Sequence, residues 1–356
     1  MERVIAGMSG GVDSAVAAFL LKEAGYDVTG VTLRTWSSEE YSRCCDVSDA
    51  EEAARKIGIP FYSFNCSDLF RKTVTEPFAR EYLRGRTPNP CIICNRYVKW
   101  DRMEIYASLL DAKYVATGHY ARIVKLPNGR YTVRSAAHEQ KDQTYMLYRL
   151  TQEQLSRTLM PLGELSKDEV RDIAGTIGLA SADKPDSQEI CFVPDDDYAG
   201  YIERNSDAPA CTEGYFVNEA GEVLGRHKGI IHYTVGQRKG LGIAMGHPLY
   251  VSAIDAEKNI VVLSDEEALL RRNVICTDVN FLSVSGLSEG EKIRCRAKIR
   301  YHHEAAPAWA SVRDGRLVIE FDEPVRAAAP GQSAVLYDED KNVIGGGIID
   351  HACDQI

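Results

Sequence analysis

The sequence predicts an α/β domain with a parallel sheet at the N-terminus, followed by a second half that is mostly β. Up to about Tyr120, short apolar runs alternate with helical patterns that end at glycine. From about Tyr215 onward the helical periodicity nearly vanishes, and short strand-like segments replace it. Alternation of strand and helix favours parallel pairing with right-handed crossovers, so ligands are expected at the carboxyl ends of the strands.

The N-terminal elements follow from apolar runs and helix stop signals. A helical pattern that begins at Ala15 ends at Gly25, and a second helix, which we expect Ser48 to cap, ends at Gly58. The expected strands around these helices are residues 3–7, 28–33, 59–64 and 113–117.

Beyond Tyr120 the pattern changes. Asn128-Gly129 predicts a hairpin, and Ser166 with Glu169 forms a capping box that opens a helix ending at Gly178. The strands expected in the second half are 229–235, 249–254, 260–263, 292–301 and 317–321. These strands predict a small β-rich domain and then a barrel or sandwich, with domain boundaries near residues 205 and 275.

Composition limits the class of protein. The chain has 356 residues, of which 44% are apolar and 26% charged, so its cores do not require disulfides. Ten scattered cysteines, no recognisable signal segment and no membrane-spanning apolar stretch predict a cytoplasmic protein with no membrane partner. The net charge of -10, taken alone, argues against a nucleic-acid partner.

A loop of small residues follows the first strand and reads Met8-Ser9-Gly10-Gly11-Val12-Asp13-Ser14. Such a loop turns backbone N–H groups toward one anion, and the following helix adds its partial positive charge. It is neither a Walker loop, since it lacks the Gly-Lys-Ser/Thr ending, nor a dinucleotide fingerprint. The alternative is a glycine turn that serves only packing.

Two cysteines lie in unusual surroundings. Cys94 follows a proline-rich segment, which presents it from a loop or a helix start, and three arginines near it in sequence favour a thiolate. These arginines are Arg84, Arg86 and Arg96. The other cysteine is Cys191, far along the chain, so only the fold can bring the two thiols together.

Several segments together resemble the tRNA-specific 2-thiouridylases, a family of PP-loop ATP pyrophosphatases. They are the glycine loop and residues 89–94, 116–122, 141–145, 187–192 and 233–242. The resemblance runs over nearly the whole chain and implies a fold and an activity. The fold is an adenine nucleotide α-hydrolase-like domain (1–205), a small central β-rich domain (206–275) and a C-terminal β-barrel that contacts tRNA (276–356). The activity is ATP-dependent adenylation of the wobble uridine (position 34) at C2, followed by sulfur transfer from a cysteine persulfide.

The resemblance also implies roles for individual residues. Cys94 would be the nucleophile, Cys191 would carry the persulfide, and Asp13 would help to hold Mg²⁺ that enters with ATP. The implied ATP contacts are Gly7, Met8, Ser9, Gly10, Gly11, Val12, Asp13, Ser14, Leu33 and Gly118. The implied tRNA contacts are Asn89, Pro90, Cys91, His119, Lys141, Asp142, Gln143, Arg300, Tyr301 and Gln332. The implied partners are the anticodon region of tRNA and a sulfur-relay or cysteine desulfurase protein.

The implied reaction has two parts, adenylation of the uridine oxygen and transfer of sulfur, and the second part needs two thiols. Once adenylated, the uridine oxygen can leave as AMP when sulfur attacks C2. Either the persulfide on Cys191 attacks C2 directly, or Cys94 attacks the persulfide, releases a hydrosulfide that attacks C2, and forms a disulfide with Cys191. The chain departs from the family at Cys91, where many members carry an aspartate that can act as a general base. Together with Cys44 and Cys45, Cys91 and Cys94 offer four thiols for zinc or an iron–sulfur cluster. We do not favour this alternative, because adjacent cysteines are not the usual spacing and a ligated Cys94 could not act freely.

A basic stripe in the second half suggests where RNA binds despite the acidic net charge. Between Lys292 and Arg300 five basic residues occupy every second position, so on a strand they share one face. With Tyr301 after it, this stripe predicts a phosphate track with a ring for stacking, although such stripes are often solvated faces. His119, at the end of an expected strand, is interpreted as a site residue, and the alternative is a histidine with a purely structural role. Two other classes of protein remain open: a PP-loop amide-forming ligase and a non-catalytic RNA- or metal-binding protein.

Overall fold

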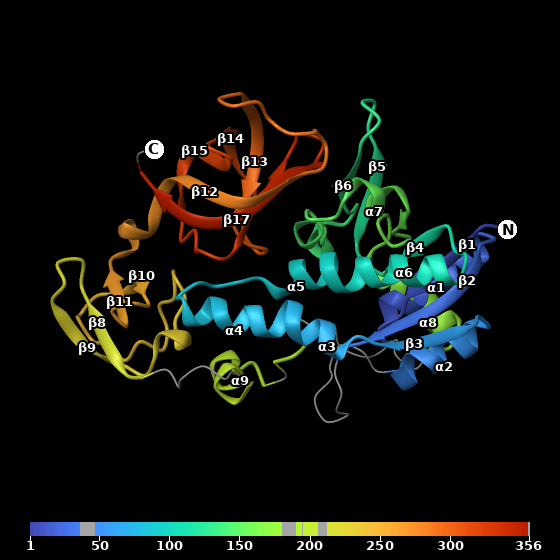
Figure 1. The fold of residues 1–356 in the computed structure, drawn as a ribbon, viewed down its shortest axis with the longest axis horizontal. Coiled ribbons are helices and arrows are strands. Elements are labelled where there is room, and N and C mark those ends of the chain that lie inside the picture. Colours follow the sequence, from blue (N-terminus) through green and yellow to red (C-terminus); the bar gives the residue numbers. More distant parts are fainter. Residues whose placement is uncertain (36–46, 180–189, 194, 206–211, 355–356) are drawn as a thin grey trace. The chain divides into compact units, whose positions relative to one another are not determined.

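The computed structural model describes residues 1–35, 47–179, 190–193, 195–205 and 212–354 (Figure 1). They fall into two compact units. The first unit contains Met1–Val74, Cys91–Asp196 and Asp340–Val343, and the second contains Thr75–Pro90, Asp197–Glu339 and Ile344–Ile356. Cys44, Cys45 and residues 187–189 of the predicted motifs lie outside the described residues.

The first unit is built on a five-stranded parallel sheet with the order β3-β2-β1-β4-β7. Its strands are β1 (Arg3–Gly7), β2 (Asp27–Arg34), β3 (Phe61–Asn65), β4 (Tyr114–Ala116) and β7 (Thr158–Leu159). The strand order reverses between β1 and β4, and such a switch point leaves a crevice beyond the carboxyl ends of the two strands.

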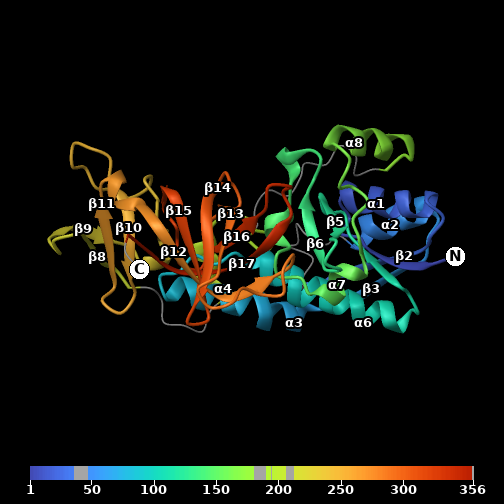
Figure 2. The same cartoon turned by 90° about the horizontal axis from the view of Figure 1, so that it is seen from above.

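Helices cover both faces of this sheet, as Figure 2 shows for α1, α2 and α8 on one side and α6 on the other. Alanines on the inner face of α1, among them Ala15 and Ala18, are fully buried and let the helix approach the sheet closely. The helices of the first unit are α1 (Val12–Glu23), α2 (Val47–Ile57), α3 (Ser67–Phe70), η1 (Arg71–Thr75), α5 (Pro90–Ile93), η2 (Cys94–Trp100), α6 (Asp101–Leu109), η3 (Glu139–Lys141), η4 (Thr144–Met146), α7 (Gln152–Ser156) and α8 (Lys167–Thr176).

An antiparallel hairpin of β5 (Ala121–Lys125) and β6 (Tyr131–Ser135) completes the first unit. Residues from near the C-terminus lie along its second strand. Ser135 N donates to Lys341 O at 3.1 Å, and Thr132 Oγ1 donates to Val343 O at 2.6 Å. The segment 340–343 therefore belongs to the N-terminal fold although about 200 residues separate it from the hairpin in sequence.

The described part of the second unit contains short helices, a four-stranded sheet and a closed six-stranded barrel. Its helices are α4 (Glu76–Leu83), α9 (Tyr198–Asn205), η5 (Ile230–His232) and η6 (Glu266–Leu269). The four-stranded sheet has the order β10-β11-β8-β9, with β8 (Gly214–Val217), β9 (Val223–His227), β10 (Tyr250–Asp255) and β11 (Ile260–Ser264). The barrel order is β12-β15-β14-β13-β16-β17, with β12 (Leu270–Phe281), β13 (Lys292–Lys298), β14 (Ala306–Arg313), β15 (Arg316–Arg326), β16 (Ser333–Tyr337) and β17 (Val343–Cys353).

The predicted fold class is confirmed, with three local errors. The segment 229–235 is not a strand, because Gly229 has a φ of 126° and leads into the short helix η5. Ser48 does not cap its helix, since α2 already includes Val47. β13 ends at Lys298 rather than residue 301, because the chain turns there and His303 N donates to Arg300 O at 3.1 Å.

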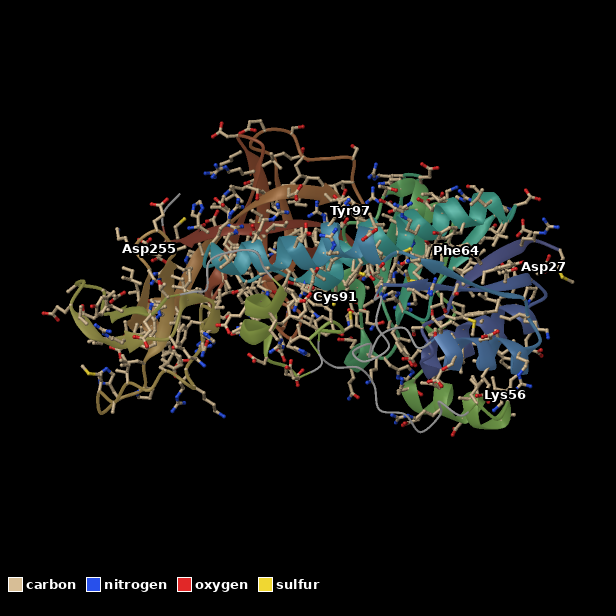
Figure 3. All side chains as sticks on the ribbon, turned by 60° about the horizontal axis from the view of Figure 1, so that its bottom comes forward. Asp27, Lys56, Phe64, Cys91, Tyr97 and Asp255 are labelled. Carbon is tan, nitrogen blue, oxygen red and sulfur yellow. The ribbon has the colours of Figure 1, made fainter. Side chains whose placement is uncertain are left out.

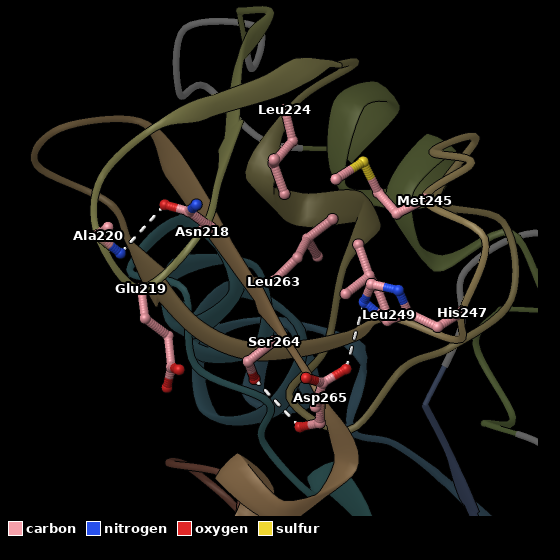
Figure 4. A pocket seen from close by; sticks show the side chains of 10 residues that line it. All are labelled: Asn218, Glu219, Ala220, Leu224, Met245, His247, Leu249, Leu263, Ser264 and Asp265. Atoms are coloured by element: carbon pink, nitrogen blue, oxygen red, sulfur yellow. Dashed lines mark hydrogen bonds and ion pairs between the residues drawn. The ribbon is translucent and has the colours of Figure 1, made fainter.

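A cavity of about 290 Å³ lies in the four-stranded part of the second unit (Figure 4). His247 Nε2 lies 3.3 Å from Asp265 Oδ1 at its wall. The lining residues are Asn218, Glu219, Ala220, Leu224, Met245, His247, Leu249, Leu263, Ser264 and Asp265. None of them is a residue to which the sequence assigns a role.

Candidate active site

The predicted phosphate loop lies at the switch point of the sheet, between the end of β1 and the start of α1. Gly10 has a φ of 82°, a conformation that favours glycine, and Gly11 occupies the N-cap position without a side-chain cap. A helix start of this kind leaves its first N–H groups available for an anion. Within the loop, Ser14 Oγ accepts from Ser9 N at 3.1 Å and donates to Gly11 O at 3.0 Å, which holds the turn in shape.

The neighbouring strands position two further residues that the sequence assigns to ATP. Gly118 follows β4 and lies against the start of α1, where a Cβ atom would come within 2.7 Å of Ser14 N and 2.8 Å of Asp13 C. Only glycine fits at this position without moving the loop. Leu33 is buried at the end of β2, the strand on the other side of β1.

Asp13, in the first turn of α1, is held by two residues from elsewhere in the first unit. Tyr120 OH donates to Asp13 Oδ1 at 2.7 Å, and Lys167 Nζ lies 2.7 Å from Oδ1 and 2.9 Å from Oδ2. Lys167 is 8% exposed. Sequence reasoning missed both partners, and their only signal was their place: Tyr120 follows the strand-end motif, and Lys167 is the first residue of a capped helix.

Asp142 and Gln143, which the sequence assigns to tRNA contact, form hydrogen bonds within the first unit close to Tyr120. Gln143 N donates to Tyr120 O and Gln143 Oε1 accepts from Tyr120 N, both at 3.0 Å. Asp142 is buried and accepts from Ala136 N at 3.0 Å and from Thr144 Oγ1 at 2.6 Å. Gln143 therefore helps to position Tyr120, and Asp142 holds the neighbouring residues Ala136 and Thr144.

His119 is largely enclosed beside Gly118. Its Nδ1 lies 2.9 Å from Thr117 Oγ1, and its ring lies 5.6 Å from that of the buried Trp100. Burial, helped by the nearby charge of Lys99, lowers the pKa of His119 to about 3. The imidazole is therefore neutral at physiological pH and acts as a hydrogen-bonding group rather than a cation.

Cys94 is the first residue of the π-helical segment η2 and is 8% exposed. It lies one turn into a helical stretch that begins at Pro90, and Cys91 lies on the first turn (Figure 3). Single π-helical turns are frequent at functional sites. The three arginines near Cys94 in sequence each contact a carboxylate: Arg84 and Arg86 pair with Glu81 at 3.3 and 2.8 Å, and Arg96 pairs with Asp101.

Cys191 is partly exposed in a short turn in which Val193 N donates to Ile190 O at 2.9 Å. The next residue, Phe192, is fully buried, and its ring packs edge-on against Phe70 at 5.7 Å. Phe70 ends α3, and α3 also packs against η2, the helix that begins at Cys94. One helix is thus the common neighbour of both cysteine segments within the first unit.

An aromatic ring with two cations lies further along η2. The ring of Tyr97 (Figure 3) has the guanidinium of Arg96 at 5.0 Å and that of Arg149 at 5.7 Å. Arg149 Nη2 also donates to Tyr97 OH at 3.3 Å. This cluster was not found from the sequence, because Arg149 comes from a distant segment.

The remaining residues assigned to tRNA lie in the second unit. Gln332 Nε2 donates to Thr87 O at 3.1 Å, which fixes the chain just before Asn89 and Pro90. Arg300 and Tyr301 follow β13, whose alternating basic residues face outward as predicted. Two of these charges are compensated: Lys292 lies 3.1 Å from Glu320, and Arg294 binds Asp322 through two contacts of 2.7 and 2.6 Å. The Arg294 guanidinium holds the pKa of the Asp322 carboxyl below its usual value.

The described residues lack the features of two other kinds of site. Among these residues no group of three or more His, Cys, Asp or Glu side chains could hold a metal ion, and the four-cysteine alternative depends on residues beyond them. No helix in the described part of the chain is long and apolar enough to cross a membrane.

Comparison with known proteins first defines the class. Family models match three successive stretches: the "tRNA methyl transferase HUP domain" at residues 2–195, the "tRNA methyl transferase PRC-barrel domain" at 206–265 and the "Aminomethyltransferase beta-barrel domain" at 271–349. The first is an α/β nucleotide-binding domain, in agreement with the loop at the switch point.

Full-length relatives then define the family. The chain is 51% identical to tRNA-specific 2-thiouridylase MnmA of Lachnoclostridium phytofermentans, over 98% of this chain and 99% of that protein. It is 49% identical to the protein of the same name from Clostridioides difficile, over 98% of each chain, and 50% identical to that from Acetivibrio thermocellus, over 98% and 99%. The chain belongs to the tRNA-specific 2-thiouridylase family.

Proposed function

We propose that this protein replaces O2 of the wobble uridine (position 34) of tRNA by sulfur, at the expense of ATP. The proposal rests on one observation: the first unit contains both a phosphate loop and a pair of cysteines. It holds a phosphate loop whose helix has no side-chain cap, and it also holds Cys94 and Cys191 on two segments that share α3 as a neighbour. A site for adenylation and a pair of thiols are the two parts that this reaction needs.

Adenylation makes the uridine oxygen a leaving group. Uridine O2 attacks the α-phosphorus of ATP, the bond from that phosphorus to the β-bridging oxygen breaks, and pyrophosphate departs with the electron pair. The N–H groups at the start of α1 stabilise the negative charge on the phosphates. Gly118 keeps this helix start in place, since any larger residue would displace it.

The donor set at the loop fits a Mg²⁺ ion that arrives with the nucleotide. Mg²⁺ is usually bound by one or two carboxylates together with substrate phosphates, and Asp13 supplies one carboxylate at the loop. When bound, the ion would neutralise phosphate charge. Tyr120 and Lys167 orient the Asp13 carboxylate through the contacts described above.

Sulfur transfer follows at C2 of the activated base. The terminal sulfur of a persulfide on Cys191 attacks C2 and AMP leaves with the former O2; Cys94 then breaks the sulfur–sulfur bond. In the other order, Cys94 attacks the persulfide first and releases a hydrosulfide that attacks C2. In both, a Cys94–Cys191 disulfide forms and a dithiol reductant reopens it. Partial exposure of Cys191 suits loading by a sulfur-relay or cysteine desulfurase protein.

The anticodon region of tRNA is the proposed partner of residues in both units. In the first unit these are Cys91, Lys141 to Gln143 and the neutral His119, with Tyr97 and its two arginines as a further stacking and phosphate contact. In the second unit they are Asn89, Pro90, Arg300, Tyr301 and Gln332. We place the reaction in the cytoplasm, where the thiols of this scheme are kept reduced.

The test is direct formation of the product. The purified protein is incubated with unmodified tRNA, ATP and a persulfide source, and the RNA is digested and analysed for 2-thiouridine. We expect 2-thiouridine with the wild type and none with Cys94→Ser or Cys191→Ser, whereas Cys353→Ser, a matched change at a cysteine of the second unit, should retain activity. Absence of 2-thiouridine with a competent sulfur supply would refute the proposal. ATP turnover that yields no 2-thiouridine and survives Cys191→Ser would instead favour an amide-forming PP-loop ligase.

The same preparation tests the metal alternative. Anaerobic purification followed by metal analysis and an absorption spectrum should find less than stoichiometric iron and zinc. Stoichiometric iron or zinc would assign Cys91 and Cys94 to a cluster and require another route for sulfur.

A further inference from the structure

Lys167 is an unusual residue for its position in the fold. It is the first residue of α8, directly after the N-cap Ser166, and is 8% exposed. The start of a helix carries partial positive charge, so a cation there is opposed by the helix, and burial removes the water that would solvate it. A lysine in such a place requires a strong local reason.

The ammonium group of Lys167 lies beside the phosphate loop. Its ammonium lies 2.7 and 2.9 Å from the two oxygens of Asp13, in the first turn of α1, and 6.0 Å from the centre of the Tyr120 ring. Helices α1 and α8 pack against each other. The positive charge is therefore held beside the N–H groups that face an anion bound at the start of α1.

The loop itself carries no cation. A Walker loop includes its own lysine for the terminal phosphates, but the sequence here from Met8 to Ser14 has none. The charge that Walker loops carry internally is supplied in this fold from α8, 154 residues away from Asp13 in sequence.

We propose that Lys167 binds the β- and γ-phosphates of ATP and stabilises the pyrophosphate that leaves during adenylation. The inference rests on the proposed function. When the bond to the α-phosphorus breaks, negative charge accumulates on the pyrophosphate, and an ammonium group at that end of the loop stabilises it. Asp13 holds the ammonium in position, so that the cation needs little reorganisation when the nucleotide binds.

Ligands of different length separate this role from a purely structural one. AMP lacks the β- and γ-phosphates, so only ATP and pyrophosphate can contact the proposed cation. We would measure the affinities of ATP, AMP and pyrophosphate by calorimetry for the wild type, Lys167→Met, Lys167→Gln and Lys167→Arg. Lys56→Met serves as the matched control, because Lys56 is a lysine of the same unit whose ammonium lies 3.3 Å from Glu52 on the surface of α2.

We expect the methionine and glutamine variants to bind ATP and pyrophosphate about 10- to 100-fold more weakly, in line with the loss of a charge-assisted contact. AMP affinity should change less than about 2-fold, the arginine variant should recover part of the loss, and Lys56→Met should resemble the wild type. Lys167→Gln keeps a donor for Asp13, so it tests the proposal if the methionine variant does not fold.

Two outcomes would overturn the inference. Equal losses for ATP and AMP would make Lys167 a structural partner of Asp13, and unchanged ATP affinity in folded variants would remove it from the phosphate site. If the Lys167 variants overturn the inference in either way but the wild type binds ATP, the proposed function still stands. If the wild type binds no ATP, the proposed function fails as well, and the two failures are thereby distinguished.

Discussion

Gly118→Ala is the most stringent test of the geometry at the phosphate loop. The added Cβ atom would lie 2.7 Å from Ser14 N, 2.8 Å from Asp13 C and 2.9 Å from Ser14 Cα. All three atoms belong to the backbone and cannot rotate away. Ordinary contacts of a Cβ atom begin at 3.4 Å, so Ser14 N, at 2.7 Å, must move away by about 0.7 Å to accommodate the methyl group. Overpacking of this kind costs about 1–3 kcal/mol.

The shift falls on the N–H groups that the proposal assigns to the phosphates. We therefore expect ATP affinity to fall by about 10- to 100-fold and Tm to fall by a few degrees, measured by calorimetry and thermal melting. The matched control is Gly175→Ala within α8, where nothing lies within 4 Å of the added methyl. Alanine at that helical position should leave ATP affinity unchanged and raise stability slightly. Wild-type ATP binding by Gly118→Ala would refute this account of the loop.

Three further predictions address the other parts of the site. Tyr120→Phe removes the hydroxyl that donates to Asp13 at 2.7 Å and should weaken MgATP binding about 10-fold while AMP affinity holds; an unchanged MgATP affinity would contradict it. Arg300→Ala should weaken tRNA binding and lower its salt dependence with ATP affinity constant, whereas Arg294→Ala, already paired with a carboxylate, should change tRNA affinity little. Because the pKa of His119 is lowered to about 3, the unfolded chain takes up its proton first as pH falls, so stability declines from roughly pH 6 toward pH 4. His119→Gln should show a smaller decline in denaturant titrations, and an unaltered pH dependence would show that the histidine is not neutral in the fold.

Local patterns predicted those parts of the fold that depend on local sequence. The parallel sheet, the capping box before α8 and the alternating face of β13 were all visible, because side-chain period and capping chemistry act over a few residues. The segment 229–235 was misread for the same reason. Its apolar run resembles a strand, but Gly229 has a positive φ and the chain continues into the short helix η5.

Contacts between distant segments could not be predicted in this way. The loop was identifiable from its glycines, but its partners Tyr120 and Lys167 come from two other segments of the chain. Asp142 and Gln143 were assigned to tRNA by resemblance, while their described hydrogen bonds hold neighbouring backbone. The roles of such residues depend on the three-dimensional neighbours of each side chain, and the sequence does not carry those neighbours.

The placement of residues 340–343 has a consequence for how the protein is made. The hairpin β5–β6 is translated long before the segment that hydrogen-bonds to β6, because that segment follows the barrel strands β12 to β16 in the sequence. The nucleotide-binding fold therefore stays unfinished until the barrel has been translated. A fragment that stops at the end of the N-terminal domain would expose Thr132 and Ser135 without these partners, so shortened versions made for binding studies should retain the C-terminal segment or supply it as a peptide.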